Sequence, residues 1–548
     1  MAHPISASSK RDVFLLFLPR SDEGGTILSD LPYMFLYLER ALRGLGLEII
    51  FLDESRHPDY LPVLLEKRDR VLLAGVSAMT GFQIASGIAF SKKVREVCRA
   101  PVVWGGWHPT LLPEQTLEAS CVDFVVVGQG ERPLRQLVAR LLRGQDASDI
   151  PGLGYKRGAA VTVNPALPML PPSAFPPINL GLLDLDEYVY EPPPAKRCLA
   201  YFTSHGCPFH CAFCSVALVY ERRWYHQPIP QIIHDLRFLK EQADIDSVSF
   251  EDDNFFVDKR FCRELATAMI EARLDLKWRC AAHSRLFTEK FDDDDMELFA
   301  RSGCFQIYIG AESGDQKVLD ALDKRSTVQH TFDFVRALKR HGIIPRLSTM
   351  VCLPMDPARD FDLTLDMVGH AKLEDRDLQA SIWFYTPYPG TELFEAAKQR
   401  GFVPPTRLED WSRHTLTDFR APWAPAGCRD RLENFREFYF RMLDGEDYRN
   451  RRSLFGRAIA FPFNKLFHAM ARLRLQALWF DFPVEARLFL GLRQCYRWLR
   501  PEVRARRATP AAAAQLGHAF QREGGQSPCA ARPPTSSSGR WAQSHPGP

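Results

Sequence analysis

Three cysteines lie close together near the middle of the chain, in the run His-Gly-Cys-Pro-Phe-His-Cys-Ala-Phe-Cys at residues 205–214. Cys207, Cys211 and Cys214 have the spacing C-x3-C-x2-C. Four cysteines usually close a structural zinc site or complete an iron–sulfur cluster. Three thiolates can bind three irons of a cubane cluster and leave the fourth iron open to a ligand. The count therefore indicates a reactive metal centre.

The residues before the motif show where these cysteines lie in the fold. Residues 198–204 read as a strand, which places the cysteines on a loop at the C-terminal end of that strand. Barrel-type α/β enzymes carry their active sites at this end of their strands. The alternatives are a zinc knuckle or a chance spacing.

The motif resembles the signature of the radical S-adenosylmethionine (SAM) superfamily, in which Phe213 matches the aromatic position before the last cysteine. The resemblance implies that a [4Fe-4S] cluster on the three cysteines binds SAM through the amino and carboxylate groups of SAM. Reduction of the cluster would then cleave SAM to a 5′-deoxyadenosyl radical.

Composition limits the remaining possibilities. A chain of 548 residues has room for two or three domains, and its net charge of +3 is too small to indicate a nucleic-acid partner. The 13 cysteines are mostly isolated, and residues 1–10 do not resemble a secretory leader, so we expect a reducing, cytoplasmic location. The sequence contains no run of 18 apolar residues, so we expect no membrane-spanning helix.

Residues 11–144 alternate strand-like and helix-like segments, which predicts an α/β domain with a doubly wound parallel sheet. Such sheets bind ligands at the carboxyl ends of their strands. Three glycine-containing loops occur there, at residues 77–81, 105–110 and 128–131. Together they resemble the cobalamin-binding domain joined to many radical SAM proteins. The resemblance implies cobalamin contacts at Thr80, Gly81, Gly105, Gly106, His108, Gly128, Gly130 and Glu131.

No Asp-x-His-x-x-Gly motif is present to supply a histidine below the cobalt. His108 is the single histidine in these loops, and a local hydrogen bond is its alternative role. Each glycine alone could also be a plain turn.

Residues 197–411 contain six strand-like segments with helical crossovers, which predicts an incomplete β/α barrel of the TIM type. Polar residues follow several of the strands. By resemblance to cobalamin-dependent radical SAM enzymes, Glu251 and Asp252 meet the SAM amino group and Glu312 meets its ribose. Arg346 is a candidate partner of its carboxylate. The alternatives are a solvated acidic turn for Asp252 and a surface salt bridge for the neighbouring candidate Arg285.

The other segments are predicted to support these two domains. Residues 145–196 form a proline-rich linker, and residues 412–507 form a helical extension in which Asp430 caps a helix over 431–443. The basic amphipathic helices within 451–507 either pack against the barrel or contact an anionic membrane. Residues 508–548 are predicted to be a disordered tail.

The chain is therefore interpreted as a cobalamin-dependent radical SAM enzyme, resembling the anaerobic magnesium-protoporphyrin ester cyclase and hopanoid methylase branch. The resemblance implies methyl transfer to an unactivated carbon of a hydrophobic or lipid-like substrate, with electrons from a flavodoxin or ferredoxin. One alternative is a radical SAM cyclase or rearrangement enzyme without methyl transfer. The other is a non-catalytic cobalamin or redox sensor.

Overall fold

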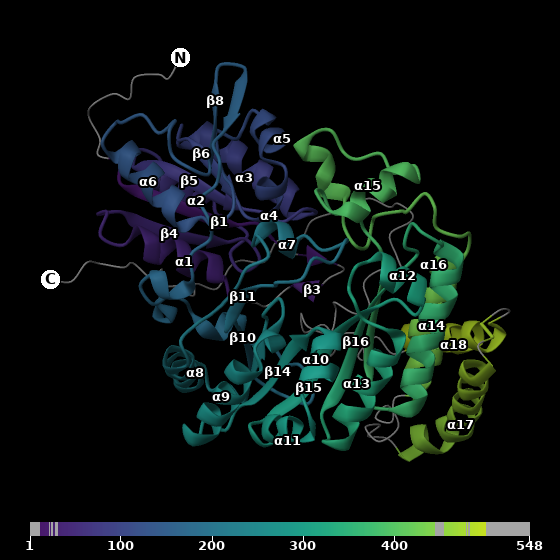
Figure 1. Cartoon of the computed structure of the whole chain (residues 1–548). Coiled ribbons are helices and arrows are strands. Elements are labelled where there is room, and N and C mark those ends of the chain that lie inside the picture. The colour runs from purple at the N-terminus through teal and green to yellow at the C-terminus, as the bar shows by residue number, and fades with distance from the viewer. Residues whose placement is uncertain are drawn as a thin grey trace.

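The computed structural model describes residues 11–20, 22–23, 26–27, 31–443, 454–477, 479–480 and 483–499. Two α/β units lie against each other, with a group of helices beside the second unit (Figure 1). The predicted tail, 508–548, lies outside the described residues.

The N-terminal unit contains the predicted doubly wound sheet. Five parallel strands run in the order β4 (Glu48–Asp53), β1 (Val13–Leu18), β5 (Val71–Ser77), β6 (Val102–Gly105) and β7 (Phe124–Val126). The helices around them are α1 (Tyr33–Leu42), α2 (Leu61–Lys67), α3 (Gln83–Val97), α4 (Trp107–Leu111), α5 (Pro113–Glu118) and α6 (Glu131–Leu142). β1 is apolar and almost wholly buried, as a central parallel strand covered on both faces should be.

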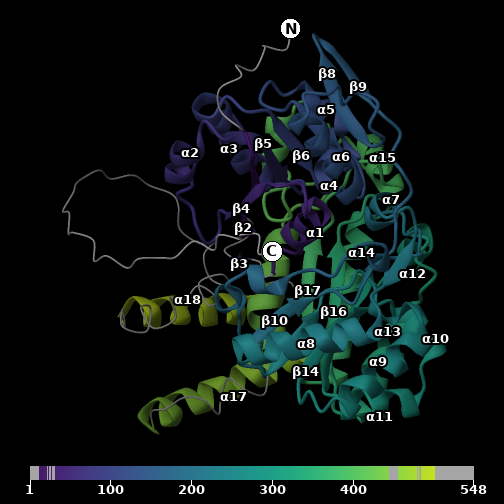
Figure 2. The same ribbon diagram turned by 90° about the vertical axis from the view of Figure 1, so that its left-hand side faces the viewer.

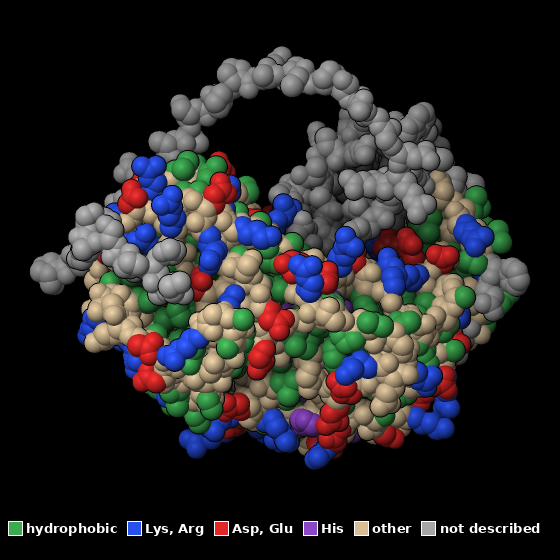
Figure 3. Space-filling view, turned by 90° about the horizontal axis from the view of Figure 1, so that it is seen from above, with side chains coloured by type: hydrophobic (Ala, Val, Ile, Leu, Met, Phe, Trp, Pro, Cys, Tyr) green, Lys and Arg blue, Asp and Glu red, His purple; other side chains and the backbone are tan. Residues whose placement is uncertain are grey.

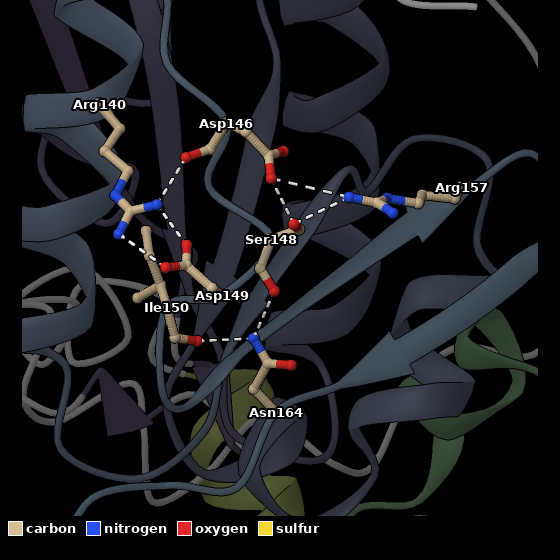
Figure 4. Close-up of polar contacts among 7 residues, drawn as sticks. All are labelled: Arg140, Asp146, Ser148, Asp149, Ile150, Arg157 and Asn164. Carbon is tan, nitrogen blue, oxygen red and sulfur yellow. Dashed lines mark hydrogen bonds and ion pairs between the residues drawn. The ribbon is translucent and has the colours of Figure 1, made fainter.

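A β-hairpin extends this sheet within the segment predicted to be linker. β8 (Leu153–Arg157) pairs antiparallel with β7 and with β9 (Ala160–Val163). Asn164 fixes the hairpin, because its side-chain amide donates to the carbonyl oxygens of Ser148 and Ile150 at 2.8 Å each (Figure 4). The linker prediction was therefore wrong for these residues. Prolines are frequent after residue 164, and they led to the prediction of a linker for the whole segment, including the short hairpin that precedes them.

The rest of that segment contains only short helical turns, η1 (Pro172–Ala174), η2 (Leu180–Leu182) and η3 (Leu185–Tyr188). Leu180, Leu185 and Tyr188 are buried in the core of the second unit. The hydroxyl of Tyr188 donates to the carboxylate of Asp53 on β4 at 3.2 Å. The connection is therefore packed against both units.

The second unit is the predicted partial barrel. Its six parallel strands run in the order β10 (Cys198–Tyr201), β13 (Ser247–Phe250), β14 (Lys277–Ala282), β15 (Cys304–Glu312), β16 (Ile344–Val351) and β17 (Gln379–Phe384). The long crossover helices are α8 (Ile229–Ala243), α9 (Lys259–Glu271), α11 (Asp293–Arg301), α13 (Val328–Arg340) and α14 (Pro357–Glu374). The fold class predicted from the alternating pattern is confirmed.

The chain then returns to the N-terminal unit. After β17, α15 (Glu392–Gln399) and η5 (Leu408–Arg413) pack beside α3 and α5 (Figure 1). Trp411 is buried there, and its indole N–H donates to Gln115 Oε1 at 2.5 Å. This return segment joins the cores of the two units.

The helices of the extension pack on the barrel. They are α16 (Cys428–Asn434), the π-helical turn η6 (Phe435–Phe440), η7 (Arg441–Leu443), α17 (Leu454–Ala477) and α18 (Val484–Leu499) (Figure 2). Phe467, Leu475 and Phe480 are buried in the barrel core, so one side of these helices packs against the barrel, and the membrane alternative stays a prediction for their exposed side. The predicted cap was wrong, because α16 begins after Gly427 and Asp430 lies inside its first turn. No described helix combines the length and the apolar character needed to span a bilayer.

Candidate active site

The cysteine loop lies at the rim formed by the C-terminal ends of the barrel strands. A short antiparallel ribbon of β11 (Ser204–Gly206) and β12 (Trp224–His226) precedes and follows it, and α7 (Val216–Val219) comes directly after the last cysteine. The Ala212 N–H donates to the Leu322 carbonyl at 2.9 Å, and the Ala212 carbonyl accepts from the Leu393 N–H at 2.9 Å. Backbone bonds therefore hold the loop from two sides.

Asp252, which follows β13, holds the entry to this loop. Its Oδ1 accepts from the backbone N–H groups of Thr203 at 2.7 Å and Ser204 at 3.0 Å, and its Oδ2 accepts from the Thr203 hydroxyl. Burial raises the pKa of Asp252 to about 7. Asp252 is thus a buried, hydrogen-bonded side chain and not a solvated turn. Its contacts support the loop, and a contact with SAM remains a prediction.

The three thiols are half-buried and free. The side-chain amide of Asn254 donates to Cys207 Sγ at 3.9 Å. Burial raises the pKa of Cys211 to about 11, while the ammonium of Lys324 acts in the opposite direction. Metal binding would release these protons, since thiolate is the ligand form.

No described group of three or more His, Cys, Asp or Glu side chains converges on a single metal ion. That finding is compatible with a cubane cluster, in which each thiolate binds a different iron. The half-buried free thiols on one short loop fit such a cluster.

A buried ion pair lies beside the cysteines. Lys324 Nζ contacts the carboxylate of Glu312, and both side chains are under one-tenth exposed. The same Nζ lies 6.0 Å from the centroid of the Phe213 ring. Glu312 takes a left-handed backbone conformation at the end of β15, with φ of 60°. The predicted ribose partner is therefore already engaged with a cation.

Sequence reasoning missed Lys324. In the run Asp-Lys-Arg at residues 323–325 it looks like a solvated charge, and only the chain path from β15 through α12 (Gln316–Ala321) brings it back to Glu312.

His283 is a second residue that the sequence did not identify. Its ring stacks on Phe209 of the cysteine loop with centroids 4.4 Å apart, and neither ring nitrogen has a hydrogen-bond partner. Burial lowers the pKa of His283 to about 3, so the ring is neutral. The neighbouring candidate Arg285 instead pairs with Glu289 at 2.9 Å on α10 (Ser284–Lys290), which is the surface salt-bridge alternative.

Glu251 and Arg346 lie on the inner side of the barrel. Glu251 accepts from the Ser249 hydroxyl and lies 3.9 Å from Arg279. Arg346 donates to Ser381 Oγ at 3.2 Å. The structure thus places the predicted SAM contacts at two levels, with Asp252 and Glu312 at the rim and Arg346 deeper.

The predicted cobalamin loops follow β5, β6 and β7. An added Cβ at Gly105 or Gly128 would meet no other atom closer than 4.0 Å, so the backbone is open to a ligand at both positions. Gly106 differs, because a Cβ there would come within 2.9 Å of the Ala78 carbonyl. Gly81 and Gly128 both have positive φ. The open glycine backbones fit a large flat ligand at this edge of the sheet.

The polar residues of the same loops have partners inside the protein. His108 is fully buried; its Nδ1 lies 3.0 Å from the Thr80 hydroxyl, and its Nε2 has no partner. Burial lowers the pKa of His108 to about 3. Glu131 forms a buried ion pair with Arg40 at 2.9 Å. His108 thus makes the local hydrogen bond that was its alternative role. Gly130 is the N-cap residue of α6, which begins at Glu131.

The cysteine loop and the glycine loops face each other. Tyr37 of α1 shares a 2.9 Å hydrogen bond with His205 Nε2, two residues before Cys207. The ring of Trp107, after β6, lies edge-on to that of Tyr220 at 6.2 Å.

A shallow polar depression lies at the opposite end of the barrel, where α8 and α9 end. It is lined by Arg237, Lys240, Glu241, Asp244, Ala272, Arg273 and Leu274.

Two family models match this architecture. The radical SAM superfamily model matches residues 201–368, and the B12 binding domain model matches residues 30–138. The chain belongs to the radical SAM superfamily and carries a B12-binding domain before its radical SAM domain. The family resemblance inferred from the cysteine motif and the glycine loops is confirmed.

Relatives of known or assigned activity include methyltransferases. An uncharacterised methyltransferase of Pyrococcus horikoshii is 31% identical over 319 residues, covering 58% of this chain and 66% of that protein. The anaerobic magnesium-protoporphyrin IX monomethyl ester cyclase of Rubrivivax gelatinosus is 25% identical, covering 54% and 52%. The match thus spans about half to two thirds of these two relatives. Bacteriochlorophyllide d C-12(1)-methyltransferase of Chlorobaculum tepidum is 26% identical, covering 78% and 86%.

Solved structures share the fold. The methyltransferase TsrM of Kitasatospora setae, solved with cobalamin and a [4Fe-4S] cluster, has a TM-score of 0.60 at 17% identity, covering 85% of this chain and 99% of that chain. The cobalamin-dependent enzyme OxsB, solved with cobalamin and SAM, has a TM-score of 0.64 at 15% identity, covering 88% and 75%.

Proposed function

We propose that the protein is a cobalamin-dependent radical SAM methyltransferase that acts on an unactivated carbon. The observation that carries this proposal is the position of the three-cysteine loop, at the rim of a partial barrel and opposite the open glycine loops of a B12-binding domain. Methyltransferases among the relatives support the reaction type.

Cys207, Cys211 and Cys214 would hold a [4Fe-4S] cluster, and the backbone at Gly105 and Gly128 would line the cobalamin site. When bound, the cluster with SAM would supply an adenosyl radical and cobalamin would supply a methyl group. The chain's own residues position these groups. Asp252 fixes the approach of the cysteine loop, and the Lys324–Glu312 pair places a cation and a carboxylate beside it. Apolar side chains of both domains pack together beside the cysteine loop, and Phe213 of that loop is among them.

The test is anaerobic reconstitution with iron, sulfide and cobalamin, followed by SAM and a strong reductant. We expect the wild type to bind about four irons per chain and to release 5′-deoxyadenosine. The triple variant with alanine at Cys207, Cys211 and Cys214 should do neither. A matched control is Cys428→Ala, a buried cysteine outside the loop. Cluster and SAM binding without any cleavage would instead favour a sensor.

Product mass separates methyl transfer from the cyclase chemistry named for several relatives, because methylation adds one carbon.

We further propose a reducing, cytoplasmic setting with a flavodoxin or ferredoxin as electron donor. The free state of every described cysteine supports it. We also propose peripheral contact with an anionic membrane through α17 and α18, which carry several exposed apolar side chains.

A further inference from the structure

The inner face of the barrel is accessible to solvent. Along β16 the residues alternate, so that Leu347 and Val351 are buried against the outer helices while Arg346, Ser348 and Met350 are partly exposed. β14 shows the same alternation. Figure 1 shows the crossover helices lying outside these strands. Because the outward residues are covered, the partly exposed residues line the barrel lumen.

The lumen carries more positive than negative charge. Arg279 on β14 donates to the Tyr190 hydroxyl at 3.0 Å and lies 3.9 Å from Glu251. Arg346 has neutral neighbours, with Ser381 Oγ at 3.2 Å and the Tyr308 ring centroid at 5.2 Å. No carboxylate in the described part of the chain lies within ion-pair distance of Arg346. The lumen thus contains one carboxylate, that of Glu251, and two guanidinium groups, those of Arg279 and Arg346.

Burial, and to a smaller extent the nearby Arg279 guanidinium, lower the pKa of Arg346, while Tyr308 and the Glu251 carboxylate act in the opposite direction. A partly buried guanidinium without a carboxylate partner lowers the stability of the fold unless a bound anion pairs with it.

Arg346 lies below the rim of the barrel. Arg346 lies five residues before the end of β16, which spans Ile344–Val351. In the β15–β16 register Glu312 at the rim pairs with Thr349, so Arg346 lies three residues, about 10 Å along the strand, below the level of Glu312. A SAM carboxylate bound to iron at the cysteine loop would stay near the rim. The expected contact of Arg346 with the SAM carboxylate stays a prediction, and a substrate anion is the other group that could pair with this guanidinium.

The wall between Arg346 and the rim is less polar. Met350 and Trp383 lie opposite each other in the β16–β17 register, above Ser348 and Ser381. Ala281 and Tyr308, on the neighbouring strands, lie at the level of Arg346 itself. The lumen thus has a cationic floor, a hydroxyl layer and an apolar upper wall.

We propose that Arg279 and Arg346 bind a carboxylate or phosphate group of the substrate, so that its hydrocarbon part extends up the lumen toward the cysteine loop. This inference rests on the proposed function and names the substrate class, an amphiphilic anion. Guanidinium groups suit both anions, because they can donate two parallel hydrogen bonds.

Calorimetric titration of the reconstituted protein with octanoate, octyl phosphate and octanamide tests it. We expect either octanoate or octyl phosphate to bind at least about 10-fold more tightly than the neutral octanamide. Arg346→Gln should weaken the binding of that anion by about the same factor. Arg346→Lys should retain part of the affinity, because it keeps the charge but cannot donate two parallel hydrogen bonds. Arg301→Gln, at an exposed arginine on α11, is the matched control and should bind like the wild type.

The preferred anion distinguishes a carboxylate from a phosphate substrate. Equal binding of octanamide, unchanged binding by Arg346→Gln, or no saturable binding of either anion would overturn the inference. Release of 5′-deoxyadenosine from SAM is assayed in parallel on the same samples. Its absence with intact anion binding would refute the proposed function alone, and the reverse result would refute the lumen site alone.

Discussion

Gly310 on β15 leaves the space in which Glu312 and Lys324 meet. A Cβ at this position would lie 2.0 Å from Glu312 Oε1 and 2.5 Å from Lys324 Nζ. The pair is buried, so it cannot move aside into solvent. The absence of a side chain at residue 310 is therefore a condition for the charge arrangement beside the cysteines.

Gly310→Ala should lower the free energy of unfolding by about 1–3 kcal/mol, because the methyl group overpacks the ion pair. Urea unfolding of the apo protein measures this. Gly491→Ala is the control, since Gly491 lies inside α18 with no other atom within 4 Å of an added Cβ. That variant should be neutral or up to about 1 kcal/mol more stable. Equal stability of Gly310→Ala and wild type would show that the pair is not confined in this way.

Asp360 offers a pH-dependent test away from the cysteines. It is fully buried at the start of α14, where it accepts from the Ser313 hydroxyl at 2.6 Å and from the Leu353 N–H at 3.1 Å. Burial raises its pKa to about 6. Between about pH 4 and pH 6 the folded protein therefore keeps a proton that the unfolded chain has released. The stabilisation from this group is complete below about pH 4 and is lost as the pH rises through 6.

Asp360→Asn should remove this dependence. From pH 4 to pH 7 the unfolding free energy of the wild type should fall by up to about 3 kcal/mol relative to that of the variant. Urea unfolding at several pH values measures it. Parallel pH profiles for the two proteins would contradict the raised pKa of Asp360.

At the scale of elements, Trp411 ties the return segment to the N-terminal domain. Its ring is 1% exposed and lies 5.7 Å from that of His108. Trp411→Ala should lower the free energy of unfolding by about 3–5 kcal/mol and speed hydrogen exchange in α5, whose Gln115 loses its partner. Trp479→Ala is the control, since this ring is half exposed. Unchanged exchange in α5 would mean that the segment is held by other contacts.

The sequence predicted the elements better than the contacts between them. Buried parallel strands such as Val13–Leu18 are continuous apolar runs, so their positions could be read directly. The partner of Glu131 is Arg40, 91 residues away, and a single sequence does not pair such residues. The β11–β12 ribbon was missed for another reason, since its three-residue strands are too short to show a period.

The whole molecule combines a mixed surface with one unusual region. In the view of Figure 3, acidic and basic side chains alternate without a large area of one sign, in keeping with the net charge of +3. α17 and α18 differ. Leu466, Leu473, Trp479, Val484 and Leu488, here called the apolar face, are each more than half exposed.

Basic residues accompany the apolar face. Lys465, Arg472 and Arg487 precede three of its leucines in the sequence and are themselves exposed. The acidic residue with a described side chain on these helices, Glu485, is buried and paired with Arg474 at 2.7 Å. Apolar and cationic side chains without exposed carboxylates match an anionic lipid surface. An amphiphilic substrate bound in the barrel lumen would partition into the same surface.

The protein should therefore sediment with vesicles of phosphatidylglycerol and phosphatidylcholine, more weakly with phosphatidylcholine alone, and less in high salt, which screens the basic side chains. Changing Leu473 and Leu488 to serine should reduce binding to the mixed vesicles by at least about 10-fold. A leucine contributes about 1.5–3 kcal/mol when fully transferred from water, and these two side chains, which are a little more than half exposed, can transfer only part of that surface. The control changes Leu61 and Leu65 to serine, because both are exposed on α2, away from the apolar face. Equal loss in both variants would mean that binding follows general surface hydrophobicity. No loss in either would contradict membrane binding through the apolar face, because the lipid would then be binding elsewhere on the molecule.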